Sequence, residues 1–139
     1  MRTAIDTNVL SAIWGGESVA SRISQVLDEA GKQGGLVVSP IVYVELRAHP
    51  NLAEGFVDRF LLTMRVAVDW VLEREIWLLA AERFEQHAQR RRRQGPGAEK
   101  RFPADYLVAA HALLSADRLV TFDQGSYRTD FPELILVEP

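Results

Sequence analysis

The chain has 139 residues, of which 47% are hydrophobic and 25% are charged, and its formal net charge is -3. This length and balance predict a single globular domain over residues 1–139 with a sizeable core, and they exclude a disordered chain. The chain contains no cysteine, which excludes a disulfide framework and cysteine-ligated zinc or iron–sulfur sites, and which suits the reducing cytoplasm where we expect it to act.

In the first half of the chain, short apolar runs alternate with helical patterns. Apolar runs bounded by turn residues predict strands, and apolar residues recurring every three to four positions predict helices. In chain order we expect a strand at 2–5, a helix at 9–14, a helix at 19–32 capped by Ser18, a strand at 36–38, a helix at 40–48 capped by Ser39, and a helix at 51–62.

The second half continues the alternation, with no internal repeat and no domain boundary. We expect a strand at 65–70, a helix at 73–93, a helix at 103–116, a strand at 118–122, a loop at 127–132 and a last strand at 134–137. Strands that alternate with helices predict an α/β fold, a three-layer α/β/α domain with right-handed crossovers and a parallel sheet of about five short strands.

Four acidic residues from distant parts of the chain are expected at one edge of this sheet. Asp6 and Asp123 each directly follow a predicted strand, at the carboxyl edge where open α/β sheets bind ligands. Asp105 lies in the first turn of one helix and Glu45 in the early part of another, and helix amino termini lie along the same edge. The helix that carries Glu45 is apolar nearly all round, so we expect Glu45 to be buried and therefore paired or bound to metal.

Each acid also has a simple structural explanation. An Asp after a strand often closes a turn or caps a helix, and Asp105 could merely complement the helix dipole. Clustered carboxylates, however, repel one another and raise one another's pKa unless a cation lies between them. Oxygen ligands suit Mg²⁺ or Mn²⁺, and such an ion can activate a water and neutralise charge on a phosphate. Convergence of the four acids therefore favours metal-dependent phosphodiester hydrolysis.

The same residues resemble the motifs of PIN-domain nucleases, in the same order and over residues 2–137. The matching positions are Asp6-Thr7-Asn8, Glu45, Asp105 followed by Ala109-Ala110-His111-Ala112, and Thr121-Phe122-Asp123. The size of the chain is similar to that of the VapC group, the toxin ribonucleases of bacterial and archaeal toxin–antitoxin pairs. The resemblance implies one PIN-like nuclease domain over residues 1–139.

This resemblance also implies an activity, partners and residue roles. A VapC-like toxin would be a Mg²⁺- or Mn²⁺-dependent endoribonuclease, usually a homodimer, that a small antitoxin protein neutralises. Asp6, Asp105 and Asp123 would hold the metal. The use of the acid at the position of Asp123 varies among such proteins, so Asp123 could instead act indirectly, without binding the metal. Glu45 would ligate the metal or position the attacking water. The supporting polar groups would be Thr7, Asn8 and Thr121.

A basic run leads into the acidic residues along the chain. The net charge does not by itself indicate a nucleic-acid binder, but four consecutive arginines exceed what the end of a helix requires. We predict that this basic segment contacts the RNA backbone, with the antitoxin interface as the alternative. Its members are Arg90, Arg91, Arg92, Arg93, Lys100 and Arg101.

Other chemistries lack their motifs. The chain has no glycine-rich dinucleotide motif or P-loop, and an aspartyl phosphatase would place a second Asp where Asn8 stands. The histidines are not spaced as a metal site, and we expect His111 in the core or at a partner contact. No apolar run is long enough to cross a membrane and no signal peptide is expected. Two alternatives stay open: a non-catalytic RNA- or partner-binding module, and a metal-dependent phosphohydrolase acting on small phosphoesters.

Overall fold

A parallel sheet forms the centre of the molecule. The computed structural model describes residues 1–97 and 100–139. Within these residues five strands form a sheet in the order β3-β2-β1-β4-β5, and every neighbouring pair is parallel. The strands are β1 (Thr3–Ile5), β2 (Leu36–Val38), β3 (Val66–Val68), β4 (Arg118–Val120) and β5 (Leu136–Val137). The predicted parallel sheet of five short strands is confirmed.

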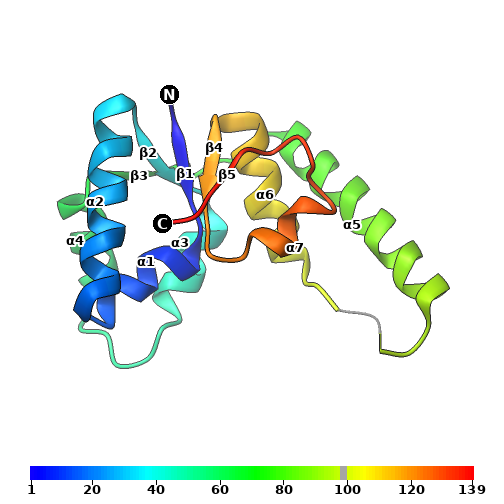
Figure 1. Cartoon of the computed structure of the whole chain (residues 1–139), viewed down its shortest axis with the longest axis horizontal. Coiled ribbons are helices and arrows are strands. Elements are labelled where there is room, and N and C mark those ends of the chain that lie inside the picture. Colours follow the sequence, from blue (N-terminus) through cyan, green and yellow to red (C-terminus); the bar gives the residue numbers. More distant parts are fainter. Residues whose placement is uncertain (98–99) are drawn as a thin grey trace.

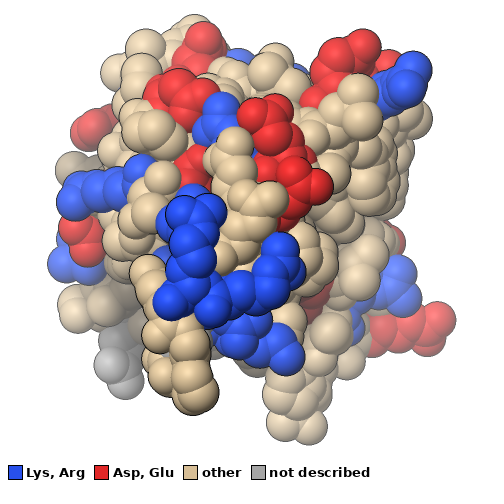
Figure 2. Space-filling model, turned by 90° about the vertical axis from the view of Figure 1, so that its right-hand side faces the viewer, with Lys and Arg blue, Asp and Glu red and all other residues tan. Residues whose placement is uncertain are grey.

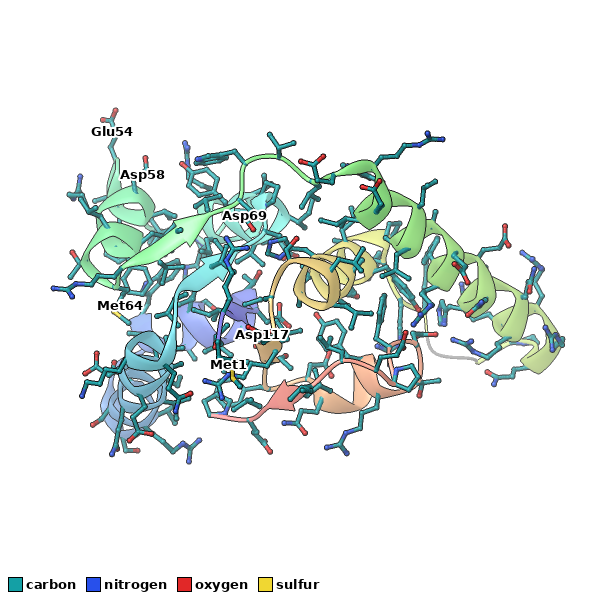
Figure 3. The ribbon with its side chains drawn as sticks, turned by 90° about the horizontal axis from the view of Figure 1, so that it is seen from above. Met1, Glu54, Asp58, Met64, Asp69 and Asp117 are labelled. Atoms are coloured by element: carbon teal, nitrogen blue, oxygen red, sulfur yellow. The ribbon has the colours of Figure 1, made fainter. Side chains whose placement is uncertain are left out.

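Helices cover both faces of this sheet (Figure 1). They are α1 (Thr7–Trp14), α2 (Glu17–Gln33), α3 (Pro40–Arg47), α4 (Phe56–Thr63), α5 (Arg74–Gln94), α6 (Pro103–Ser115) and α7 (Gln124–Arg128). Two views agree that α2 lies on one side of the strands and that α5 and α6 lie on the other (Figures 1 and 3). This arrangement confirms the predicted α/β/α layers.

The composition of the central elements explains their positions. Every residue of β1 and β2 is buried, as expected for parallel strands covered on both faces. Helix α6 is buried along most of its length, and its fully buried Ala109, Ala110 and Ala112 allow it to lie close to both β4 and α5. None of the helices in the described part of the chain combines the length and apolar character that a membrane crossing requires.

Three predicted helix starts are wrong: α1 begins at Thr7, not at residue 9, and glycines explain the other two. Helix α2 begins at Glu17 after Gly16, which has a positive φ of 73°, so Ser18 is not its cap. Helix α4 begins at Phe56, not at residue 51, because Gly55 has a φ of 72° and ends the preceding turn. A positive φ is available to glycine at little cost and interrupts a right-handed helix.

The sequence analysis also misplaced elements near the C-terminus. The segment 127–132, expected as a loop, begins inside α7. Strand β4 ends at Val120, so Asp123 does not directly follow it but occupies the cap position before α7. The cap predicted for the helix after β2 is confirmed, because the Ser39 hydroxyl accepts a hydrogen bond from the Val42 N–H at 3.3 Å.

Candidate functional site

Asp6 lies at the carboxyl end of β1 and caps α1. It is only 7% exposed, and one of its carboxylate oxygens accepts the Thr7 N–H at 2.8 Å. The other oxygen accepts the hydroxyls of Thr121 and Tyr127, each at 2.9 Å. Burial raises the pKa of Asp6 above its ordinary value despite these hydrogen bonds, and nearby Asp105 raises it further. Asp6 is therefore held rigidly, and its negative charge is incompletely compensated.

Glu45 reaches the same place from α3, but not as the sequence analysis expected. It lies in the last turn of this helix, not its early part, and its side chain is exposed, not buried. The helix buries Val42 and Leu46, while Val44 is 64% exposed, so only one side of α3 faces the core. The Glu45 carboxylate accepts a hydrogen bond from the Thr7 hydroxyl at 2.7 Å, which ties it to the residue beside Asp6.

The pKa of Glu45 is also raised. Partial loss of hydration is the main cause, and the charges of Asp6 and Asp105 add to it, while the hydrogen bond from Thr7 opposes it. Glu45 and Asp6 therefore both accept hydrogen bonds from Thr7, and the charge of Asp6 acts on Glu45.

Asp105 and Asp123 complete this edge. Asp105 lies half-buried in the first turn of α6, where loss of hydration raises its pKa, the charge of Arg101 opposes the rise and Asp123 adds to it. Asp123 is exposed, and its carboxylate accepts the Ser126 hydroxyl at 2.6 Å. The electrostatic effect of Asp123 on Asp105 indicates that the two side chains lie near each other.

Thr121 and Asn8 connect these acids. The fully buried Thr121 hydroxyl donates to Asp6 at 2.9 Å and accepts the Asp123 N–H at 3.0 Å, so it bridges two of the four. The Asn8 amide donates to Thr121 at 3.5 Å, and its oxygen accepts the Phe122 N–H at 3.3 Å. All three polar groups named from the sequence, Thr7, Asn8 and Thr121, thus contact the acidic site.

Tyr127 is a residue of this site that the sequence analysis missed. Its side chain is buried, its hydroxyl donates to Asp6, and burial together with the charge of Asp6 raises the pKa of this phenol. Tyr127 therefore remains a protonated donor at any physiological pH. The signal for it was Asp123 followed four residues later by an aromatic residue, a spacing that fits one turn of helix but was too short to stand out.

These four acids could hold a metal only after adjustment. In residues 1–97 and 100–139 no three Asp, Glu or His side chains are arranged to hold an ion as they stand. Their donor atoms are all oxygens, three of the four carboxyls have a raised pKa, and only Asp6 is fixed by several hydrogen bonds. Such a donor set fits a hard divalent cation, which would relieve the shared negative charge.

The residues of the predicted basic segment differ in their exposure. Arg90 and Arg91 are half-buried, whereas Arg92, Arg93 and Lys100 are exposed. Arg101 is the basic residue whose charge is felt by Asp105. Lys and Arg side chains gather on the face of the molecule where the last turns of α5 lie, with acidic side chains beside them (Figure 2).

Comparison with known proteins identifies the relatives of this architecture. The family model described as PIN domain matches residues 3–132. No curated protein matches the sequence. Among solved structures, VapBC-1 from nontypeable Haemophilus influenzae is similar with a TM-score of 0.72 at 22% identity, covering 99% of this chain and 98% of that one.

Two further solved structures have comparable similarity. VapBC2 from Rickettsia felis, bound to a DNA fragment from its promoter, aligns with a TM-score of 0.67 at 20% identity, covering 99% of this chain and 98% of that one. FitAcB from Neisseria gonorrhoeae aligns with a TM-score of 0.65 at 18% identity, covering 96% and 95%. At these identities the likeness establishes a shared fold over the whole chain.

Proposed function

This chain belongs to the PIN domain family, and on that premise we propose that it is an endoribonuclease that hydrolyses RNA phosphodiesters with Mg²⁺ or Mn²⁺. The observation that carries the proposal is the meeting of Asp6, Glu45, Asp105 and Asp123 from four separate elements. Three of them have a raised pKa, chiefly because burial removes water from the carboxylates and in part because the acids repel one another. Carboxylates in this state favour a bound divalent ion.

Each residue has a proposed task. Asp6, Asp105 and Asp123 would hold the ion, with Asp123 either ligating it or acting through Thr121. When bound, the ion would lower the pKa of a water and neutralise charge on the phosphate. Thr7, Thr121 and Tyr127 orient Asp6 through their hydrogen bonds.

Glu45 is the proposed acceptor of the proton from the attacking water. Its Oε1 accepts the Thr7 hydroxyl, so its Oε2 would take the proton as the water oxygen bonds to phosphorus. The phosphorus–oxygen bond to the ribose would break, and the ribose oxygen would take a proton from solvent water. A raised pKa suits this task, because a base works best when its pKa approaches the working pH. Ligation of the metal by Glu45 is the other role consistent with its position.

Removing the Asp6 charge tests this proposal. We expect purified Asp6→Asn to cleave RNA at least about 100-fold more slowly than wild type with Mg²⁺ or Mn²⁺ present. Asp28→Asn is the matched control, because Asp28 is an exposed acid of α2 and lies outside the site. If Asp6→Asn cleaves RNA as fast as wild type, the proposed site is not where the reaction occurs.

The partners belong to the same proposal. The whole-chain likeness to the VapBC and FitAcB structures supports placing the chain with the VapC group, and therefore with a small antitoxin protein as its partner. A homodimer is supported by exposed apolar residues between β3 and the first turns of α5. This apolar surface comprises Trp70, Val71, Trp77 and Leu78, each more than half exposed.

Two other activities would give different results in the same assays. A non-catalytic RNA-binding module would bind RNA equally well with and without chelator and would never cleave it. A phosphohydrolase of small phosphoesters would turn over a chromogenic phosphodiester but leave structured RNA intact.

A further inference from the structure

The four arginines at the end of α5 separate by helix face. His87, Arg90, Arg91 and Gln94 recur at the spacing of one helix face and line a hollow together with Arg101, Thr129 and Asp130. Arg92 and Arg93 do not line it, and both are exposed. The four arginines form one basic run in the sequence, but only Arg90 and Arg91 line this hollow.

The wall of the hollow contains polar atoms without partners. His87 is 8% exposed, and its Nε2 atom is buried with no hydrogen-bond partner among the described residues. The Nε atom of Arg91 is also buried and has no hydrogen-bond partner among the described residues. Because buried polar atoms nearly always have a partner, unpaired nitrogens in two residues that line one hollow favour a polar ligand there.

The charge of the hollow is positive. Arg90 forms an ion pair with the buried Asp130, which also accepts the Tyr106 hydroxyl at 2.8 Å. Three arginines, Arg90, Arg91 and Arg101, line the hollow with a single carboxylate, Asp130, so the formal charge of its lining residues is positive. Burial is the main cause that lowers the pKa of His87, and the arginines lower it further while Asp130 opposes them. The neutral histidine is therefore favoured, and the ligand must satisfy the guanidinium groups. An anion with several oxygens fits this wall, and arginine is the side chain best suited to bind phosphate.

The hollow adjoins the acidic site. A narrower hollow, lined in part by Asp105, Tyr127 and Ser126, shares Arg101 and Asp130 with it. The larger hollow has about 130 Å³ open to water-sized molecules, and since a water molecule takes up about 30 Å³, a phosphate group has room there. A strand whose cleaved phosphate lies at Asp105 would have its continuation directed past Arg101 toward Arg91.

We propose that this hollow binds one internal backbone phosphate of the RNA, beyond the cleaved one, through Arg91 with Arg90 and Arg101. Arg92 and Arg93 take no part in it. The identity of the ligand rests on the proposed function, whereas the residues that bind it are inferred from the lining of the hollow.

A comparison of Arg91→Gln with Arg92→Gln tests the proposal. The two variants remove the same charge from adjacent positions of one helix, but only Arg91 lines the hollow. The probe is a fluorescent single-stranded oligoribonucleotide with a 5′-hydroxyl end, and binding is measured by anisotropy in chelator over a range of salt concentrations.

Loss of one phosphate contact has a defined salt signature. We expect Arg91→Gln to weaken binding several-fold and to reduce the slope of log affinity against log salt concentration by about 0.7. Arg92→Gln should change both much less. Equal effects of the two variants would mean a diffuse basic surface, and an Arg91 effect seen only with a 5′-phosphate oligonucleotide would mean a site for RNA ends; either outcome overturns the proposal.

A measurement on the wild-type chain guards against misfolding of Arg91→Gln. We expect the ring resonances of His87 to shift on titration with the same oligonucleotide, because the phosphate would enter the hollow that His87 lines. Unchanged His87 resonances at saturating RNA would overturn the proposal even if Arg91→Gln were unfolded.

Binding in chelator is independent of cleavage. Failure of the wild type to cleave RNA, together with a specific Arg91 effect on binding, would reject the nuclease and leave the hollow as an RNA site. Normal cleavage with no Arg91 effect would reject the hollow and leave the nuclease.

Discussion

At the scale of single residues, the site depends on the hydrogen bonds that Asp6 accepts while it is buried. Burial raises the pKa of Asp6, and hydrogen bonds from Thr121, Tyr127 and the Thr7 backbone work against that rise. A buried carboxylate that accepts several donors keeps its charge more readily than one without them. The donors of Asp6 are therefore as important to the site as the acid itself.

Tyr127→Phe removes one of these donors without changing the shape of the core. We expect RNA cleavage to fall by about tenfold as Asp6 loses its fixed position. The loss of the donor raises the pKa of Asp6 further, so the acidic limb of the pH–rate profile should move to higher pH.

Tyr106→Phe is the matched control for this change. Tyr106 is equally buried but donates to Asp130 and not to Asp6. Both variants should lose about 1 kcal/mol of unfolding free energy with the hydrogen bond. Only Tyr127→Phe should move the acidic limb, and an equal displacement in the two variants would refute a specific role for Tyr127.

At the scale of elements, α6 joins the site to the opposite part of the sheet. Its first turn carries Asp105, while His111 further along is 1% exposed and bonds Asp69 at 2.8 Å. Asp69 also accepts from the Arg2 guanidinium at 2.8 Å, so one carboxylate after β3 connects α6 to the residue before β1 (Figure 3). His111 is thus a core histidine, one of the two positions expected from the sequence.

This contact gives the fold a pH dependence. Burial lowers the pKa of His111 below its ordinary 6.5, and the hydrogen bond with Asp69 only partly opposes this. The unfolded chain therefore takes up a proton at this histidine before the folded chain does. The stability that neutral His111 contributes is present above about pH 6.5 and is lost as pH falls below it.

Denaturant unfolding of wild type and His111→Gln at neutral and mildly acidic pH measures this effect. We expect wild type to lose more stability than the variant on acidification, by at most about 1.4 kcal/mol per pH unit. The difference between the two proteins isolates His111 from the acids of the site, whose raised pKa values act in the opposite direction. Parallel losses would show that His111 is not kept neutral by the fold.

The elements also show what the sequence could and could not predict. The sequence predicted β1, β2 and the cap at Ser39, because backbone preference and burial agree there over several residues. Helix α7 was not, because five residues give too little periodicity, and its stability comes from the burial of Tyr127 against other elements. The exposure of Glu45 was missed for a related reason: an apolar sequence does not reveal which side of a helix finds a neighbour.

At the scale of the whole molecule, the apolar surface between β3 and α5 is the clearest sign of a further contact. Trp70 is 63% exposed and Trp77 is 51% exposed. Exposing such large apolar side chains to water is unfavourable in free energy, so a partner that covers them would be stabilising. We expect the purified chain to have twice the mass of one chain by light scattering, and Trp70→Ser to shift it toward a monomer.

The control for Trp70→Ser is Leu62→Ser, an exposed apolar residue on α4. It should leave the measured mass unchanged. A wild-type monomer, or a dimer that Trp70→Ser does not weaken, would remove this surface from the dimer proposal and leave it for the antitoxin.

The charge of the whole chain also looks different once its distribution is known. A net charge of -3 hides the four acids of the site and the basic end of α5. Lys and Arg side chains gather on one face of the molecule, with acidic side chains beside them (Figure 2). In the sequence the basic run leads into the acidic residues, but only the packing of α5 against α6 separates Arg91 from Arg92. Local sequence cannot supply that information.

The central claim is that these carboxylates hold a divalent ion with which the protein cleaves RNA, and the rate of RNA cleavage against Mn²⁺ concentration at several pH values tests it most directly. Protons and metal compete for Asp6, Glu45 and Asp105, whose pKa values are raised. We therefore expect no cleavage in chelator, recovery on addition of Mn²⁺, and a lower half-saturating Mn²⁺ concentration as pH is raised from mildly acidic to neutral. Undiminished cleavage in chelator, or no cleavage at any Mn²⁺ or Mg²⁺ concentration, would contradict the claim.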